Sequence, residues 1–215
     1  MLVPQVLPPF PLAWGFSTKA DGLEALPPLR LSQVHGCGVV EATGAVQEGD
    51  GLWTTEPGVR IGVRVADCVP ILLAGHLPGR QPWIATLHAG WRGILAGIFR
   101  RGVAPFEAMG GRPEDLAWAL GPAIQPCHFE VGPEVIEAAR QDAAWREDLS
   151  HQGPKENPHL DLHGLLKAQA ADMGLDPRKD GSLNLCTVCQ RDLLWSYRCG
   201  DRTERQWGWA EILPD

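Results

Sequence analysis

The sequence lacks the features that mark membrane, secreted and nucleic-acid-binding proteins. No apolar stretch approaches the length needed to span a bilayer. Basic residues are not in excess, since 19 Lys and Arg stand against 26 Asp and Glu and give a formal charge of -7, which argues against a nucleic-acid surface. The first residues carry no basic segment and are soon interrupted by Pro8 and Pro9, so a signal peptide is not expected. We therefore expect neither a membrane nor a nucleic acid as partner.

Cysteines are also too few to form a disulfide scaffold. Six cysteines in 215 residues are typical of reduced thiols, some of them available to metals, and favour a cytoplasmic protein. Cys186 and Cys189 form a Cys-x-x-Cys pair, but the sequence holds no second pair of this kind. We therefore expect both thiols to be reduced and to hold no metal of their own. Cys127 and His128 suggest a nucleophile and its base, but no orienting acid is identified for them.

Apolar residues are numerous enough for one sizeable core. They make up 44% of the chain, and the length suits a single domain over residues 1–215. Strands and helices do not alternate regularly, which favours an α+β fold with mixed sheets flanked by helices. Helices are predicted at 94–109, 133–140 and 161–173, loops in the proline-rich beginning and at 26–28, and strands at 29–34, 38–42, 59–66, 71–74, 83–87, 116–124, 183–185, 193–198 and 207–213.

Three residues that commonly bind metals each follow an apolar run: His35, Cys68 and His88. Zinc accepts thiolate and imidazole, and a catalytic zinc site uses three protein ligands and keeps a fourth position open. Structural zinc sites usually take their ligands in local pairs, whereas widely separated ligands at strand ends suit a site that the fold assembles. Each residue taken alone is explained as well by a place in the core or in a loop, and spacing does not show that the three meet.

An anion site is predicted just after His88, where Gly90 and Gly93 flank Trp91 and Arg92. This turn leads from a strand into a helix, and the first backbone N–H groups of a helix attract anions. The Arg92 guanidinium can add two parallel hydrogen bonds to a phosphate. Arg92 is therefore a candidate for phosphate binding and for catalysis. The alternative is that Trp91 packs in the core and Arg92 is a surface charge.

Seven short strings follow one another between Gln33 and Arg198, within a resemblance that runs along almost the whole chain, from about Gly15 to Leu213. They are Gln33-Val34-His35-Gly36, Ala66-Asp67-Cys68-Val69-Pro70, His88-Ala89-Gly90-Trp91-Arg92-Gly93, Gly121-Pro122-Ala123-Ile124 with Cys127, Phe129-Glu130-Val131-Gly132, Cys186-Thr187 and Ser196-Tyr197-Arg198. In these strings the chain resembles the laccase-like multicopper polyphenol oxidase family, whose bacterial members are also called purine nucleoside phosphorylases. The string that begins at His88 is highly specific.

The resemblance implies a zinc site made by His35, Cys68 and His88 in one compact domain. It also implies cytoplasmic phosphorolysis of purine nucleosides, with phosphate and with adenosine, inosine, guanosine or methylthioadenosine as substrates. Adenosine deamination is a second implied activity. The family's older name implies copper in place of zinc and polyphenol oxidation, but three ligands without the His-rich clusters of multicopper oxidases suit that chemistry less well.

Four further residues are candidates for the site. Gln33 and Thr187 are expected to hydrogen-bond the substrate, with polar roles in the core as the alternative. Asp67 is expected to act as a base or to orient a metal ligand, and a purely structural carboxylate is at least as good an explanation. Lys19 stands where the resembled family has an arginine, in a segment that is also shortened, so a contact with the substrate there would lose its bidentate geometry.

Two other classes of function would use the same residues. A cysteine hydrolase or amidase would use Cys68 as nucleophile and His88 as base, without a metal. A non-catalytic interaction protein would use zinc only for stability. Metal analysis separates the hydrolase from the other two, and phosphate-dependent release of adenine from adenosine separates the phosphorylase from the interaction protein. The sequence does not determine the oligomeric state.

Overall fold

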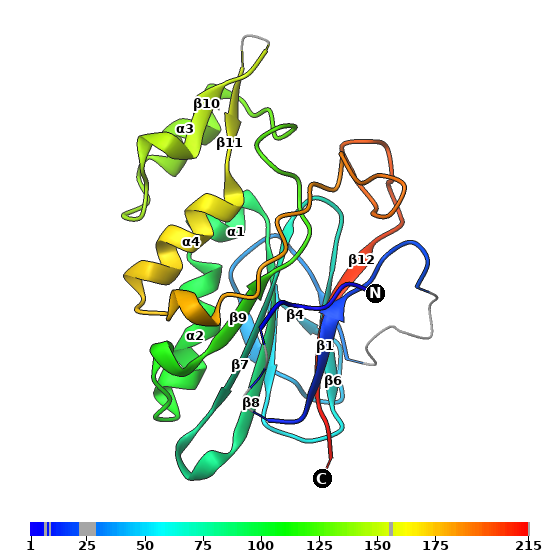
Figure 1. Ribbon diagram of the computed structural model, residues 1–215, viewed down its shortest axis with the longest axis vertical. Coiled ribbons are helices and arrows are strands. Elements are labelled where there is room, and N and C mark those ends of the chain that lie inside the picture. Colours follow the sequence, from blue (N-terminus) through cyan, green and yellow to red (C-terminus); the bar gives the residue numbers. More distant parts are fainter. Residues whose placement is uncertain (7, 9, 22–28, 155–156, 215) are drawn as a thin grey trace.

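The computed structural model describes residues 1–6, 8, 10–21, 29–154 and 157–214, and its layers are visible in Figure 1. The middle layer is a five-stranded sheet with the order β3 (Val39–Glu41), β5 (Gly51–Thr54), β8 (Pro82–Ala89), β7 (Val69–His76) and β9 (Ala117–Leu120). A three-stranded sheet covers one face, with the order β1 (Leu12–Phe16), β12 (Gln206–Ile212) and β6 (Arg60–Val65). The fold is α+β with mixed sheets, as predicted.

Strand β7 shows why the sheet lies in the middle. Ile71 and Leu73 point into the core beneath the helices, whereas Leu72 and Ala74 point into the core between the two sheets. Because successive side chains of a strand face opposite sides, a strand buried on both faces is apolar at nearly every position. Pro70 is tolerated in β7 because the pairing with β9 begins only at the next residue.

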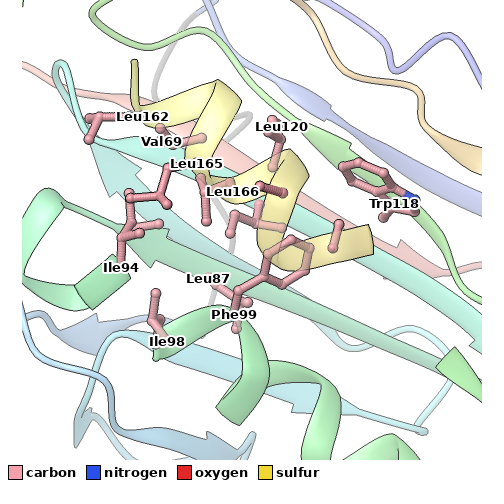
Figure 2. Packing of buried hydrophobic residues seen from close by; sticks show 14 of the residues in the cluster. Val69, Leu87, Ile94, Ile98, Phe99, Trp118, Leu120, Leu162, Leu165 and Leu166 are labelled. Carbon is pink, nitrogen blue, oxygen red and sulfur yellow. The ribbon is translucent and has the colours of Figure 1, made fainter. Parts of the chain in front are cut away.

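Helices α1 (Trp91–Leu95), α2 (Ile98–Ala108) and α4 (Leu162–Asp172) cover the other face of the five-stranded sheet. Figure 2 shows Leu162, Leu165 and Leu166 of α4 packed together with residues of α1, α2 and the sheet, among them Ile94 and Phe99. All five of these side chains are buried. Burying each such side chain stabilises the fold by roughly 1.5–3 kcal/mol, which holds the helical layer on the sheet.

The remaining elements are short and lie at the margins of these layers. Helix α3 (Pro133–Ala139) packs near the antiparallel pair β10 (Ser150–Gln152) and β11 (Pro158–Leu160), and β2 (Leu31–Ser32) pairs in parallel with β4 (Gln47–Glu48). Single 3-10 turns cover Pro78–Arg80, Pro113–Asp115, Glu147–Leu149 and Pro177–Lys179. Within the described ranges, no helix has both the length and the apolar character to cross a membrane.

The predicted helices at 133–140 and 161–173 are confirmed, and the second begins as expected, because Asp161 accepts a hydrogen bond from the Gly164 N–H. The helix predicted at 94–109 is two helices, because Gly97 adopts a left-handed φ of 83° between them. The predicted strands at 183–185 and 193–198 are wrong: these residues form turns and irregular backbone. Leu183 and Leu194 of these segments are nevertheless buried, without any strand pairing.

Other strand predictions differ mainly at their ends. The strands at 59–66, 83–87 and 207–213 match observed strands within a few residues, whereas the strand predicted at 116–124 ends at Leu120. Five of the observed strands were not predicted: β1, β4, β5, β10 and β11. The loop predicted at 26–28 lies outside the described residues.

Candidate active site

The three candidate metal ligands converge from three different parts of the fold. His35 lies in the loop between β2 and β3, Cys68 in the turn between β6 and β7, and His88 near the end of β8. One ligand atom of each residue lies within 4.8 Å of those of the other two. The rings of His35 and His88 meet edge to face, with their centroids 4.7 Å apart. We call these three residues the pocket cluster.

A buried carboxylate, Asp50, holds two members of the pocket cluster from behind. Its Oδ1 lies 2.8 Å from Nδ1 of His88 and accepts a hydrogen bond from the His35 N–H at 3.0 Å, while its Oδ2 accepts one from the Gly36 N–H at 2.7 Å. With Nδ1 of His88 occupied by the carboxylate, Nε2 is the ring atom left for a metal. The sequence analysis missed Asp50, because one acidic residue before a strand is not a specific signal.

The same contacts change the protonation of the cluster. Burial raises the pKa of the Cys68 thiol, but hydrogen bonds with His35 and His88 and the charges of both rings outweigh it and lower the pKa to about 7. Burial lowers the pKa of His88, but its hydrogen bonds with Asp50 and Cys68 raise it to about 9. Metals bind the thiolate form of cysteine, so the site favours the form of Cys68 that a metal needs.

A cavity of about 680 Å³ opens onto the pocket cluster. This volume lies within the range of about 300–1,000 Å³ that is usual for small-molecule sites. Its wall combines apolar side chains with a few polar ones, the composition expected of a site that orients an organic ligand. The lining residues are Leu31, Ser32, Gln33, His35, Arg64, Val65, Ala66, Asp67, Cys68, His88, Ile124, Phe129, Tyr197, Arg198 and Arg205.

Three arginines line this cavity, and none of them was predicted: Arg64, Arg198 and Arg205. In the portion of the chain that the structure describes, none forms an ion pair with a carboxylate. Burial lowers the pKa of Arg64, and the positive charges of Arg205 and Arg30 lower it further. The three positive charges therefore outnumber the single carboxylate of the wall, Asp67, and none of them pairs with it, which favours an anionic ligand.

Asp67 lines the cavity beside Cys68, and both of its carboxylate oxygens already have partners. Oδ1 accepts a hydrogen bond from the Thr187 hydroxyl at 2.5 Å, and Oδ2 accepts one from the Arg198 N–H at 2.7 Å. Its backbone has a φ of 83°, which residues other than glycine rarely adopt. Thr187 is fully buried and does not line the cavity. The structure thus shows Asp67 and Thr187 joining two loops, in agreement with the structural alternatives.

Gln33 and Lys19 also have protein partners. Gln33 lines the cavity, but its amide exchanges hydrogen bonds with the backbone of Arg64, at 2.9 Å to the carbonyl and 2.8 Å from the N–H. The ammonium of Lys19 donates to the Arg191 carbonyl and lies 4.3 Å from the centre of the Trp195 ring. Lys19 lines a neighbouring hollow and not the cavity at the pocket cluster.

Arg92 is exposed and absent from the wall of the cavity, since its guanidinium lies 4.3 Å from the ring centre of its neighbour Trp91. The two glycines serve close packing instead of an anion. A Cβ atom at Gly90 would lie 3.1 Å from Sγ of Cys68, and one at Gly93 only 2.6 Å from the carbonyl of Gly36. The structure therefore favours the alternative that Arg92 is a surface charge.

A second group of metal-binding side chains lies between two loops. Cys127 and His128 of one loop meet Cys186 and Cys189 of another, with one ligand atom of each within 4.8 Å of the others. We call these four residues the loop cluster. The prediction that Cys186 and Cys189 lack a second ligand pair is wrong. That pair comes from a distant part of the chain and takes the form Cys-His, so a search for repeated Cys-x-x-Cys could not find it.

Comparison with known proteins places this chain in a family. Residues 18–212 match the family described as "Multi-copper polyphenol oxidoreductase laccase". The purine nucleoside phosphorylase YfiH of Shigella flexneri is 36% identical over 184 residues, covering 83% of this chain and 71% of that protein. Adenosine deaminase RL5, from an unknown prokaryotic organism, is 30% identical over 179 residues, covering 77% of this chain and 67% of that protein.

A solved structure of lower sequence identity confirms the fold. The crystal structure of YlmD from Geobacillus stearothermophilus superimposes with a TM-score of 0.81 at 25% identity. It covers 97% of this chain, and this chain covers 94% of it. The arrangement of layers described above is therefore shared by a protein of known structure.

Proposed function

The chain belongs to the family of laccase-like multicopper polyphenol oxidoreductases, and on that premise we propose that it cleaves purine nucleosides by zinc-dependent phosphorolysis. The observation that carries the proposal is the pocket cluster facing a cavity whose arginines lack carboxylate partners. Relatives named purine nucleoside phosphorylase support the reaction class.

The pocket cluster fits zinc by the chemistry of its donors. One thiolate and two imidazoles are ligands that zinc readily takes, and three protein ligands leave a position for water or substrate. His35, Cys68 and His88 would hold the ion, and Asp50 would keep His88 in the required tautomer. When bound, zinc supplies a Lewis acid at the cavity. Copper also binds thiolate and imidazole, so the metal content of the protein decides between the two.

The arginines of the cavity would bind phosphate. Arg64 and Arg205 line the wall together, and their like charges repel each other while no carboxylate neutralises them. An anion between them relieves this repulsion and gains charge-assisted hydrogen bonds. The guanidinium of Arg205 is partly engaged, because it donates to the carbonyls of Glu204 at 2.6 Å and Arg202 at 3.1 Å. Arg198 is engaged in the same way, because its guanidinium donates to the carbonyls of His128 at 3.2 Å and Glu130 at 3.0 Å. Its main role is to fix the wall of the cavity.

Aromatic and apolar residues would receive the purine. Phe129 and Tyr197 both line the cavity, and Tyr197 has half of its surface exposed. A flat purine gains by packing against such rings, because aromatic pairs are stabilised beyond the area they bury. In phosphorolysis a phosphate oxygen bonds to C1′ of the ribose, the bond from C1′ to N9 breaks, and the departing purine gains a proton. The side chains described here hold the two reactants together.

The test is release of adenine from adenosine by the zinc-loaded protein, with and without inorganic phosphate. We expect adenine and ribose 1-phosphate in equal amounts, and only when phosphate is present. The variant His35→Ala should lose this activity together with the zinc of the pocket cluster, whereas His151→Ala, an exposed histidine on β10, should lose neither. Absence of phosphate-dependent release of the free base from all four nucleosides, adenosine, inosine, guanosine and methylthioadenosine, contradicts the proposal.

A second activity, adenosine deamination, is favoured by the relative named adenosine deaminase RL5. The same pocket cluster would serve, because a bound zinc ion can activate water as well as orient a substrate. Inosine formation without phosphate measures it directly. Deamination should disappear in His35→Ala in parallel with phosphorolysis, and deamination that persists in this variant contradicts a shared site.

A metal-independent cysteine hydrolase also has one observation in its favour, because Cys68, His88 and Asp50 contact one another in series. The lowered pKa of Cys68 suits a nucleophile as well as a ligand. Removal of metal by a chelator separates the two proposals. Phosphorolysis should stop and return with added zinc, whereas activity of a thiol nucleophile would survive chelation and be stopped by iodoacetamide.

A further inference from the structure

We propose that the loop cluster is a second, structural zinc site with Cys127, His128, Cys186 and Cys189 as its ligands. This site is separate from the pocket cluster and does not depend on the function proposed for it. Three thiolates and one imidazole are a common ligand set of structural zinc, which is four-coordinate and closed. The four residues supply that set without any contribution from water or substrate.

The distances within the loop cluster match a tetrahedron around zinc. Bonds of about 2.3 Å to sulfur and about 2.0–2.1 Å to nitrogen place two sulfurs about 3.8 Å apart and a sulfur and a nitrogen about 3.6 Å apart. Sγ of Cys127 and Sγ of Cys189 are 3.7 Å apart, and Nδ1 of His128 lies 3.6 Å from Sγ of Cys186 and 3.5 Å from that of Cys189. Sγ of Cys127 and Nδ1 of His128, which belong to adjacent residues, are closer to each other, at 3.2 Å.

The backbone around Cys186 favours a thiolate at this ligand. Burial acts against the charged form, but the backbone N–H groups of Cys189, Gln125 and Val188 outweigh it. Further hydrogen bonds fix the two loops to each other, because Ala123 forms an isolated bridge with Cys186. The ligands are therefore held in place by backbone contacts outside the metal site itself.

The position of the loop cluster indicates what the zinc would stabilise. The loop with His128 also carries Phe129, and the loop with Cys186 continues to Tyr197 and Arg198, all three of which line the cavity. These loops have almost no regular structure, so few backbone ladders hold them. A closed metal site between them would fix the wall of the cavity without entering it.

The experiment counts metal in the protein purified under reducing conditions without added metal or chelator. We expect two zinc ions per chain in the unaltered protein and one in Cys68→Ala. In the Cys68→Ala background, Cys127→Ser combined with Cys189→Ser should lose the remaining ion, while Cys199→Ser, a thiol of the same loop outside the cluster, should keep it. A cobalt-substituted Cys68→Ala protein should show tetrahedral d–d bands and intense sulfur-to-cobalt charge transfer.

Two results would overturn the proposal. One is a Cys68→Ala protein that is folded but binds neither zinc nor cobalt at equimolar concentration. The other is a disulfide between Cys127 and Cys189 that persists under reducing conditions and blocks metal binding. If the double serine variant fails to fold, Cys189→His replaces it, since histidine keeps a ligand at that position. This variant should retain zinc and weaken the charge-transfer band, and an unchanged band excludes Cys189 as a ligand.

Discussion

The pocket cluster and the loop cluster use the same two kinds of side chain but differ in ligand number and in surroundings. The pocket cluster offers three donors, faces a cavity and has the buried carboxylate of Asp50 behind it. The loop cluster offers four donors and has backbone N–H groups around one of its sulfurs. With zinc bound, the first would leave a position for substrate and the second would not. The number of donors and what lies beside them distinguish the two more clearly than residue type does.

Loss of the thiol from the pocket cluster should have the largest effect on activity. We expect Cys68→Ala to lower phosphorolysis by at least about 10³-fold, because the Lewis acid contributes several kcal/mol to the transition state. Steady-state adenine release measures the loss, and thermal unfolding should show a protein that remains folded. Cys199→Ala is the matched control and should keep full activity. Near-normal activity in Cys68→Ala would contradict a catalytic metal at this cluster.

The carboxylate behind the pocket cluster gives the next largest effect. We expect Asp50→Asn to weaken zinc binding at the pocket cluster by about 10–100-fold, the usual cost of losing the partner of a ligating histidine. Competition with a chromophoric chelator measures the affinity. Asp192→Asn, at an exposed position, should bind zinc normally. Unchanged affinity in Asp50→Asn would show that the contact with His88 does not support the metal.

Loss of one cavity arginine should separate phosphate binding in the cavity from metal binding at the pocket cluster. We expect Arg64→Gln to raise the KM for phosphate by about 10-fold or more, since a hydrogen bond to a charged group contributes about 1.5–3 kcal/mol. Zinc content should not change. Arg101→Gln, an exposed arginine on α2, serves as control. A normal KM for phosphate in Arg64→Gln would remove this residue from the anion site.

The smallest effect is expected at Arg92, which follows the pocket cluster in sequence but lies outside the cavity. Arg92→Ala should change phosphorolysis and the KM for phosphate by less than about threefold, because its exposed guanidinium lies over the half-buried ring of Trp91 and such surface contacts contribute about 0.5–1 kcal/mol. Kinetics at varied phosphate measure both values. A large rise in KM would instead support the anion site predicted from the sequence.

The ligands of the pocket cluster were accessible to sequence reasoning because each closes a recognisable pattern. His35, Cys68 and His88 follow apolar runs, and their side chains belong to the few types that bind zinc. Asp50 was not accessible, since its role depends on contacts with residues 15 and 38 positions away. Arg64 was missed for a similar reason: it looks like an exposed strand residue until the cavity is known.

The α+β class, the apolar runs that form the long strands and the residue types at the pocket cluster follow from the sequence alone. Local physics suffices for these, because periodicity and side-chain chemistry act over a few residues. That Cys127 and His128 meet Cys186 and Cys189 is visible only in the tertiary structure. Sγ of Cys127 and Sγ of Cys189 are 62 positions apart in the chain but lie 3.7 Å from each other. Such contacts depend on how loops without regular structure close over the core, and no local pattern in the chain encodes that closure.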